Sequence, residues 1–411
     1  MATTNPQEIA SVFVNGREYT EWESVWVQER WTEPFAYARF TANEGRLNVN
    51  NWRTLQFKPG DPAVVSLGGQ PIINGFITVR QTSANATAHM VQHTIKSYSF
   101  WPYKSSVFTT DGNFDGKTFL QIADIVLARW GGYEKLGEPL DPSPFKTAQS
   151  KPGDNIWEWL EEKARSKGAI LGTAPVSGRP LIIGAHDGTI IGHVTDGDNI
   201  LQIQCTISIE AFMTDYYVNT SQPGDDQTNG PDAAQPPPGY APGYAPVPSI
   251  LYIPMEDPGG KPQADMRASF EARWTHASEI TCNVTVPGWF AQNGGLWHAG
   301  MDVMVYSPMA MVVGEVLKIN TATFQQDNNT GTTTTLELVA PWGRLDQINA
   351  NTGPTSGSVA PGPPTATQPP AQPTATGSPA SPPPSLANQA GLGDIQATLG
   401  EKLGLGDIGK Q

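Results

Sequence analysis

The chain has 411 residues, of which 38% are hydrophobic and 16% are charged, so it is long enough for two or three domains with cores of their own. Its formal net charge of −14 has the wrong sign for a protein that binds nucleic acid by neutralising phosphates. The 42 Gly and 37 Pro exceed what compact elements accommodate, so part of the chain must be linker.

The first ten residues are polar and lack the basic and apolar regions of a secretion signal. The sequence also has no apolar run long enough to span a bilayer as a helix. We therefore expect no membrane anchor, and a protein that is made and kept in a cytoplasm.

The first hundred residues predict a series of β-hairpins. Asn15-Gly16 is a strong signal for a type I′ turn, and a second hairpin is expected to turn at Asn74-Gly75. Alternate residues from His89 to Ile95 share one face of a further strand. Short strands and turns at this spacing favour a small antiparallel β-barrel, which we assign to residues 10–105.

Residues 106–218 mix helices and strands. Thr118 and Gln121 form a capping box ahead of an apolar helical stripe, and this stripe stops at Gly131-Gly132 as a helix C-terminus should. A second helix and two strands complete this middle domain: a helix from Asn155 to Gly168, and strands around 181–183 and 200–209.

Residues 219–248 are polar and rich in Pro and Gly, with Pro-Gly-Tyr-Ala at 238–241 and again at 242–245. Since such a stretch has too few apolar groups to offset chain entropy, we predict a mobile linker that contributes to no packed core.

A second strand-rich domain is assigned to residues 249–345. It begins with a helix that places Met266, Phe270, Trp274 and Ala277 on one side. The strands expected after this helix are 280–286, 303–306, 312–319 and 332–339, the last of them after a turn at Asn328-Asn329.

The C-terminal part divides into a linker and a short tail. Residues 346–385 are rich in Pro and Thr and are expected to be extended or disordered. Residues 386–411 repeat Gly-Leu-Gly-Asp-Ile, and one helix face is predicted to dock on a partner through Leu392, Ile395, Leu399 and Leu403. Gly400 weakens this helix, so a frayed terminus stays open as the alternative.

The two cysteines lie in alternating apolar runs that are typical of strands. Two cysteines make neither a disulfide framework nor a four-ligand zinc site. We therefore interpret Cys205 and Cys282 as small buried hydrophobic residues.

No metal site or cofactor is expected. Asp111 to Gly116 imitates the start of an EF-hand loop, but Ile122 stands where a bidentate Glu is required, so an Asx-rich turn is favoured. His89 and His93 are four residues apart in a predicted strand, which separates the two rings by roughly 13 Å, too far to share one ion.

No catalytic residue is expected either, so the chain is predicted not to be an enzyme. His186-Asp187 and Cys205 are the residue types of a cysteine hydrolase, yet Cys205 has no neighbour that would lower its thiol pKa. The adjacent carboxylates Glu161-Glu162 and Asp225-Asp226 do not present the facing acid and base of a glycosidase. Most of the 12 Trp occupy periodic apolar positions and indicate packing.

Taken in order, the sequence resembles the Mu-like family of phage tail baseplate hub proteins, which is related in fold to the T4-type hub and to the base of type VI secretion spikes. The resemblance covers about residues 10–345, and its N-terminal matches are Asn15 to Val27, Gly68 to Gln70 and Gly75 to Ile77. The middle matches are Thr118 to Ala123, Asn155 to Glu158, Ala164 to Gly168 and Asp215 to Val218. The C-terminal matches are Gly288-Trp289, Gly295 to Trp297 and Thr334 to Leu338.

The resemblance implies a β-rich α+β fold with two small antiparallel β-barrel-like domains that bracket the mixed domain. It implies the structural hub of a contractile tail, in which a homotrimer presents six similar barrels to the sixfold tail tube. The implied partners are the tail tube or tube-initiator protein, the central spike and other baseplate proteins, with DNA only in transit. The implied location is the virion, after assembly in the host cytoplasm.

The chain departs from the family at Ser97-Tyr98-Ser99, where relatives have a Gly-Arg segment, and this leaves the local strand pairing open. Two alternatives come from other classes. A tail-associated peptidoglycan hydrolase needs a carboxylate pair or a Cys/His site on adjoining elements. A carbohydrate-binding adhesin places exposed aromatic side chains on one strand face.

Overall fold

The computed structural model describes residues 8–43, 57–84, 89–186, 188–220, 237–255, 259–328 and 330–341. All of them belong to the first of two compact units, Met1–Thr355. The N-terminal strands, here called the N-terminal β-block, are β1 Ala10–Val14, β2 Arg17–Tyr19, β3 Ser24–Arg30, β4 Tyr37–Asn43, β5 Pro62–Leu67, β6 Gln70–Ala84 and β7 His89–Ser97. The C-terminal β-block consists of β11 Ile190–Thr195, β12 Gln202–Ile207, β16 Ile280–Pro287, β17 Asp302–Ser307, β18 Val312–Asp327 and β19 Gly331–Val339.

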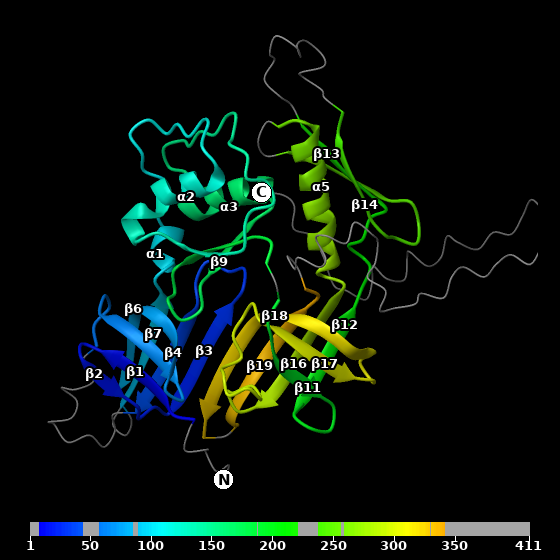
Figure 1. Cartoon of the computed structure of the whole chain (residues 1–411). Coiled ribbons are helices and arrows are strands. Elements are labelled where there is room, and N and C mark those ends of the chain that lie inside the picture. Colours follow the sequence, from blue (N-terminus) through cyan, green and yellow to red (C-terminus); the bar gives the residue numbers. More distant parts are fainter. Residues whose placement is uncertain are drawn as a thin grey trace, which may run out of the picture. The chain divides into compact units, whose positions relative to one another are not determined.

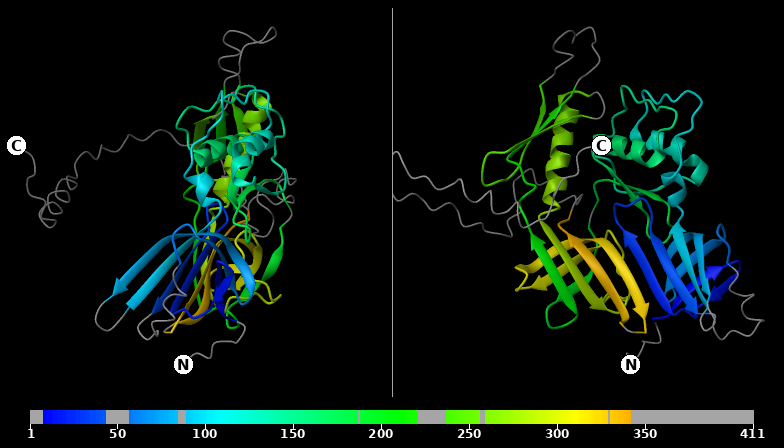
Figure 2. Two further views of the ribbon diagram at one scale, coloured as in Figure 1. Left: turned by 90° about the vertical axis from the view of Figure 1, so that its left-hand side faces the viewer. Right: turned by 180° about the vertical axis from the view of Figure 1, so that it is seen from behind.

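The two β-blocks form one hydrogen-bonded sheet. Its strand order is β12-β16-β19-β18-β3-β4-β7-β6-β5-β1-β2, and β17 joins β11 to β18 at the side. In Figures 1 and 2 the blue N-terminal strands therefore lie side by side with the yellow and orange C-terminal strands. One apolar cluster, which includes Val27, Phe40, Trp289 and Phe324, packs against this sheet from both blocks. The expected β-rich α+β class is confirmed.

Strands β11 and β12 lie within residues 106–218, which the sequence assigned to the middle domain. In the structure β11 pairs in parallel with β17, and β12 pairs antiparallel with β16. The sequence predicted the strand that contains β12 but not β11, and alternation does not identify the neighbouring strand.

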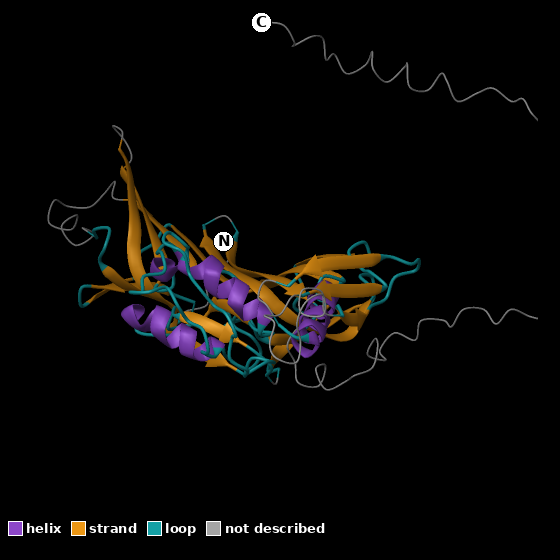
Figure 3. Cartoon of the chain, turned by 90° about the horizontal axis from the view of Figure 1, so that it is seen from above, coloured by secondary structure: helices purple, strands orange, loops and turns teal. Residues whose placement is uncertain are grey.

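The middle block comprises α1 Phe100–Tyr103, α2 Phe119–Leu127, a 3-10 turn Ala128–Trp130, β8 Glu134–Leu136, α3 Ile156–Ser166, β9 Ile170–Thr173 and β10 Pro180–Ile183. The predicted capping box is present, since Thr118 Oγ1 accepts from the Gln121 amide and the Gln121 side chain accepts from the Thr118 amide. Asn155 caps α3 by accepting from the amides of Trp157 and Glu158. In Figure 3, which looks down from above, these helices lie over the strands.

One predicted turn is confirmed and another is wrong. Asn15 and Gly16 have φ of 50° and 79°, as a type I′ turn requires. Strand β6, in contrast, continues through Asn74-Gly75, and the hairpin turns at Gly68-Gly69 instead. Gly75 serves a different purpose, because a Cβ there would overlap the carbonyl of Lys96 on β7. The position requires close approach of two strands and not a turn.

The predicted linker 219–248 is wrong in its second half. Strand β14, Gly239–Pro242, pairs with β13, Asp215–Asn219, which in turn pairs with β15, Ile250–Pro254. Ala241 is 4% exposed and packs with α5, Lys261–His276, in a small apolar cluster, so this stretch does contribute to a core. Small residues made this possible, since a Cβ on Gly239 would overlap the backbone of Ala264 on α5. Residues 221–236 lie outside the described part of the chain.

Candidate functional site: the seam between the two β-blocks

The two β-blocks meet where β3 pairs with β18. The antiparallel register runs from Arg30 opposite Thr321 to Ser24 opposite Asp327. Because side chains alternate along a strand, one set faces the shared core and includes Val27 and Phe324. The other set faces away from that core and, apart from Trp26, is polar. We call this contact the seam.

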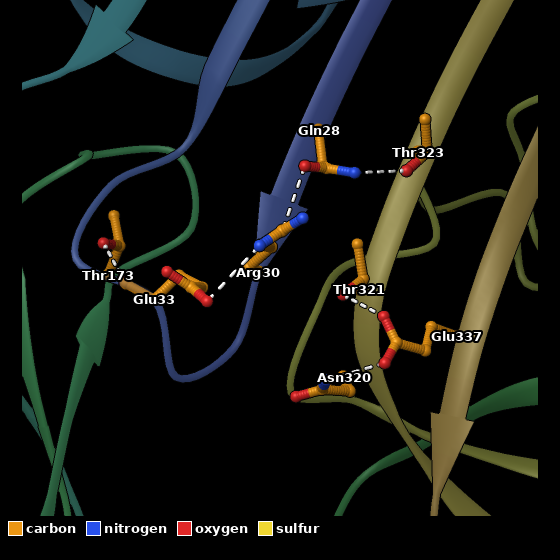
Figure 4. Close-up of polar contacts among 8 residues, drawn as sticks. All are labelled: Gln28, Arg30, Glu33, Thr173, Asn320, Thr321, Thr323 and Glu337. Atoms are coloured by element: carbon orange, nitrogen blue, oxygen red, sulfur yellow. Dashed lines mark hydrogen bonds and ion pairs between the residues drawn. The ribbon is translucent and has the colours of Figure 1, made fainter. Parts of the chain in front are cut away.

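Polar side chains tie the seam together on its outward face (Figure 4). Gln28 Nε2 donates to Thr323 Oγ1 at 3.0 Å, and Gln28 Oε1 accepts from Arg30 Nε at 2.9 Å. Thr321 donates to Glu337 of β19 at 2.8 Å. Gln28, Thr321 and Thr323 are all less than a tenth exposed, so each satisfied hydrogen bond avoids the cost of burying an unpaired polar group.

The middle block joins the seam through a chain of hydroxyl groups. Ser97 Oγ accepts from the Ala36 amide at 3.0 Å and contacts Ser99 Oγ at 3.0 Å, which contacts Thr173 Oγ1 at 3.2 Å. Thr173 in turn donates to the backbone carbonyl of Glu33 at 2.9 Å. At Ser97-Tyr98-Ser99 strand β7 stays paired through Ser97, which stands opposite Gly75. The hydroxyl groups link β7 and β9 to the β3–β4 connection.

Two enclosed ion pairs fix the opposite face of the seam. Glu29 Oε2 accepts from His298 Nδ1 at 3.0 Å, and Lys318 Nζ lies 2.9 Å from Asp302 Oδ1 and 3.0 Å from the Gly300 carbonyl. Burial alone would lower the pKa of His298, but the Glu29 carboxylate beside it holds the pKa above its ordinary value. These contacts hold the 298–302 loop against β3.

The outward face continues beyond the seam as a surface of polar side chains, of which Glu337 is the charged member among those named below. Strand register places Gln204, Asn283 and Glu337 in one row across β12, β16 and β19, and Gln202, Thr285 and Thr335 in the next. Thr285 and Thr335 hydroxyls lie 3.2 Å apart. Glu337 is engaged by Thr321 and by Asn320 of β18. We call this surface the polar face.

The assignment of Cys205 and Cys282 as free, buried hydrophobic residues is wrong. They stand directly opposite each other in the β12–β16 register, with Cα atoms 4.0 Å apart, and form a disulfide. Each residue does occupy a strand, as expected, and Cys282 is fully buried. The sequence pattern showed which side of its strand each thiol occupies, but not that the two strands are neighbours. The bond links β12, at the end of the sheet, to β16.

Asp111 to Gly116 forms consecutive Asx turns, as predicted. The Asn113 amide donates to Asp111 Oδ1 at 3.3 Å, and the Asp115 amide donates to Asn113 Oδ1 at 2.8 Å. Asp115 Oδ1 also accepts from the Ala148 amide at 2.7 Å. Within the described ranges, no group of three or more His, Cys, Asp or Glu is arranged to hold a metal ion.

The histidines weighed as ligands or catalysts are packed singly. His93 is buried on β7, where burial first and Arg80 second lower its pKa to about 4. His186 packs beside the Trp31 ring at 6.0 Å, and its Nδ1 lies 2.9 Å from the Gly184 carbonyl. Asp187 and the docking residues Leu392, Ile395, Leu399 and Leu403 lie outside the described residues.

None of the helices in the described part of the chain has the length and apolarity that crossing a membrane requires. Sequence comparison adds no identification, since no family model matches the chain and no curated protein does.

Solved structures do match. The fold is similar to that of the 43 kDa tail protein of the MuSo2 prophage from Shewanella oneidensis, with a TM-score of 0.66, 19% identity, and coverage of 81% of this chain and 98% of that one. It is similar to a tail protein from Neisseria meningitidis, with a TM-score of 0.65, 16% identity, and coverage of 81% and 96%. A chain of a Francisella PdpA-VgrG complex matches at a TM-score of 0.50, 8% identity, and coverage of 81% and 58%. At these identities the likeness establishes a shared fold, that of the prophage tail proteins.

Proposed function

We propose that this chain, which has the fold of two prophage tail proteins, is the structural hub of a phage tail baseplate and not an enzyme. The observation that carries the proposal is the extent of the likeness: nearly the whole length of each prophage tail protein is matched by 81% of this chain. The seam joins the two β-blocks in one hydrogen-bonded sheet, and we infer that they act as one rigid plate. A rigid plate is what a structural adaptor between two other assemblies requires.

In this proposal three copies form a ring, so that three N-terminal and three C-terminal β-blocks alternate around the axis. The ring faces the sixfold tail tube on one side and the threefold spike on the other. Head-to-tail contacts between unlike surfaces generate closed rings when the rotation between copies is a third of a turn. Having two β-blocks in one continuous sheet supports this arrangement, since it gives each copy two comparable units at a fixed spacing.

The polar face is the surface that we assign to the channel through which DNA passes. Its Thr, Gln and Asn side chains bear no cations that would bind phosphates, and Glu337 is engaged by neighbouring side chains. A surface of this kind neither holds DNA by charge nor offers an apolar patch for a protein to stick to. Substituting Thr285 and Thr335 with Lys is expected to slow DNA delivery while particles still assemble, measured as normal tails with reduced infectivity.

Two tests address the hub role. Light scattering of the purified chain at micromolar concentration should show trimers, alone or on addition of the spike protein, and a strict monomer in both conditions would count heavily against the ring. Quantitative mass spectrometry of purified tails should find the chain in equal number to the spike protein.

We also propose that the C-terminal tail docks on another baseplate component through Leu392, Ile395, Leu399 and Leu403. Its regular Leu and Ile follow more than thirty residues that are nearly free of large apolar side chains. Deleting residues 386–411 should then impair baseplate assembly. Full infectivity and normal baseplates in the deletion phage would leave a frayed terminus as the better account.

One observation favours a second candidate, carbohydrate binding. Tyr217, Tyr240 and Tyr252 stand opposite one another across β14, β13 and β15, on the side that faces away from α5. Tyr240 and Tyr252 are 42% and 59% exposed, and the Tyr240 hydroxyl donates to Asp215 at 3.1 Å. If this row binds glycan, Tyr240→Ala with Tyr252→Ala should abolish retention on host polysaccharide, and Tyr244→Ala, at an exposed tyrosine outside the row, should not.

A further inference from the structure

Aromatic rings and cations alternate on the face of the N-terminal β-block that is turned away from the core. They come from β3, β4, β7, the β3–β4 connection and α1, which stands at the end of β7 in Figure 1. We call this set the cation–aromatic ladder, and its members are Trp26, Phe35, Tyr37, Arg39, Lys96, Phe100, Trp101 and Lys104.

Strand register brings one end of the ladder together. Trp26 stands opposite Arg39 across β3 and β4, and Tyr37 stands opposite Lys96 across β4 and β7. The Arg39 guanidinium lies 5.5 Å from the Trp26 ring centre and 5.7 Å from that of Tyr37, and these two rings are 4.8 Å apart. At such distances a cation is attracted by the electron-rich ring faces.

Two lysines occupy the other end. Lys96 Nζ lies 4.7 Å from the Phe35 ring centre and 4.1 Å from that of Phe100. Lys104 Nζ lies 5.5 Å from Phe100 and 4.7 Å from Trp101. Phe100 therefore lies between two ammonium groups. Burial first, and the neighbouring charge of Lys104 second, lower the pKa of Lys96.

In the described part of the chain, no carboxylate pairs with any of these three cations. Among the described residues, Arg39, Lys96 and Lys104 form no ion pair, and Glu33, near the start of the same face, is already paired with Arg30 at 3.3 Å. The whole chain bears an excess of negative charge, with 39 acidic against 25 basic residues. Three cations in one row therefore make this surface locally positive although the chain as a whole is negative. A positive surface favours an anionic ligand.

The surroundings of the cations distinguish between anions. Proteins that bind single-stranded nucleic acid offer open aromatic faces for bases to stack on. In the ladder, those faces are covered by the cations. The centre of a protein–protein interface is instead typically enriched in Trp, Tyr, Phe and Arg, which are present in this partly enclosed row.

We propose that the cation–aromatic ladder is a docking site for an acidic polypeptide segment of another protein. Carboxylates of that segment pair with Arg39, Lys96 and Lys104, and its apolar side chains pack on the ring edges and on Tyr103, which is 37% exposed beside the row. The docking site does not depend on the hub role, since it rests on the charges and rings of this chain alone.

The test measures binding of the full chain to fluorescent poly-glutamate, with poly-glutamine as the uncharged probe and oligo-thymidine as the nucleic-acid probe. Poly-glutamate should bind best, and binding should weaken as salt is raised. The ladder variant Arg39→Gln, Lys96→Gln, Lys104→Gln should weaken it at least about tenfold, as loss of several charge pairs does. The control variant Arg17→Gln, Lys58→Gln, Arg129→Gln removes the same charge at exposed positions elsewhere and should change binding less than about twofold.

Thermal unfolding of each variant checks that it folds. Should the triple variant fail to fold, Lys104→Glu alone changes only an exposed side chain at the end of the row and should still weaken poly-glutamate binding. Equal binding by ladder and control variants, absence of poly-glutamate binding, or tighter binding of oligo-thymidine would each overturn the proposal.

Discussion

Lys318 and Asp302 form an ion pair that the fold encloses almost completely, with side chains 1% and 0% exposed. Taking two charges out of water is costly, and their attraction offsets that cost only when both remain. The Lys318 ammonium also lies 5.3 Å from the Trp31 ring centre and donates to the Gly300 carbonyl. One cation therefore connects β18, the residue that follows β3 and the loop that precedes β17.

Removing one member of this pair should be far worse than removing both. Lys318→Met leaves the Asp302 carboxylate without its cation and is expected to lower the free energy of unfolding by about 3–5 kcal/mol. Lys318→Met combined with Asp302→Asn should recover part of that loss. Urea unfolding of both variants measures the difference. A double variant less stable than the single one would contradict the claim that loss of the Lys318 ammonium beside the Asp302 carboxylate causes the destabilisation.

His93 makes the fold sensitive to acid. Its pKa is about 4 in the folded chain against an ordinary value of 6.5. Between these pH values His93 is therefore protonated in the unfolded chain and neutral in the folded chain. The stability contributed by neutral His93 is therefore complete above pH 6.5 and is lost as pH falls towards 4, by an amount on the order of 3 kcal/mol.

His298 acts in the opposite direction, since its raised pKa gives stability that is present at low pH and lost as pH rises through the folded value. We expect His93→Leu to flatten the fall in unfolding free energy between pH 6.5 and pH 4. Chemical unfolding at a series of pH values checks this, and an unchanged slope in the variant would contradict the assignment to His93.

At the scale of the element, the disulfide is the clearest case of a contact that local pattern does not reveal. Cys205 and Cys282 are 77 residues apart, and only the pairing of β12 with β16 makes them neighbours. Local signals did predict local structure: the capping box at Thr118 and the turn at Asn15-Gly16 depend on residues within a few positions. The turn predicted at Asn74-Gly75 was wrong because a Gly can allow either a tight turn or the close approach of two strands. Only the position of the partner strand shows which of the two applies.

The disulfide should stabilise the end of the sheet by restricting the unfolded chain. Cys205→Ala with Cys282→Ala is expected to lower the free energy of unfolding by about 2–5 kcal/mol under oxidising conditions. Added reductant should destabilise the natural chain by a similar amount and leave the double variant unaffected. Equal stability of the two proteins in oxidising buffer, measured by thermal unfolding, would argue that the thiols are not joined in solution.

At the scale of the whole molecule, the seam was the feature least accessible from sequence. Gln28 and Thr323 are separated by 295 positions in the sequence. Each occupies a position whose sequence pattern is the same as that of a strand residue facing solvent. The succession of strand-rich, mixed and strand-rich segments predicted the class of fold, and the ordered motifs predicted which known fold it resembles. Strands β11 and β12 pair with strands of the C-terminal β-block. Such long-range pairing cannot be inferred from the local pattern of a single sequence.

Electron cryomicroscopy of tails purified from particles that contain this chain tests the hub assignment most directly. We expect three copies in one ring between the tail tube and the spike, with six β-blocks around the axis and the polar face towards the channel. A tail in which the chain is absent, lies off the axis, or forms a ring with any other number of copies would contradict it.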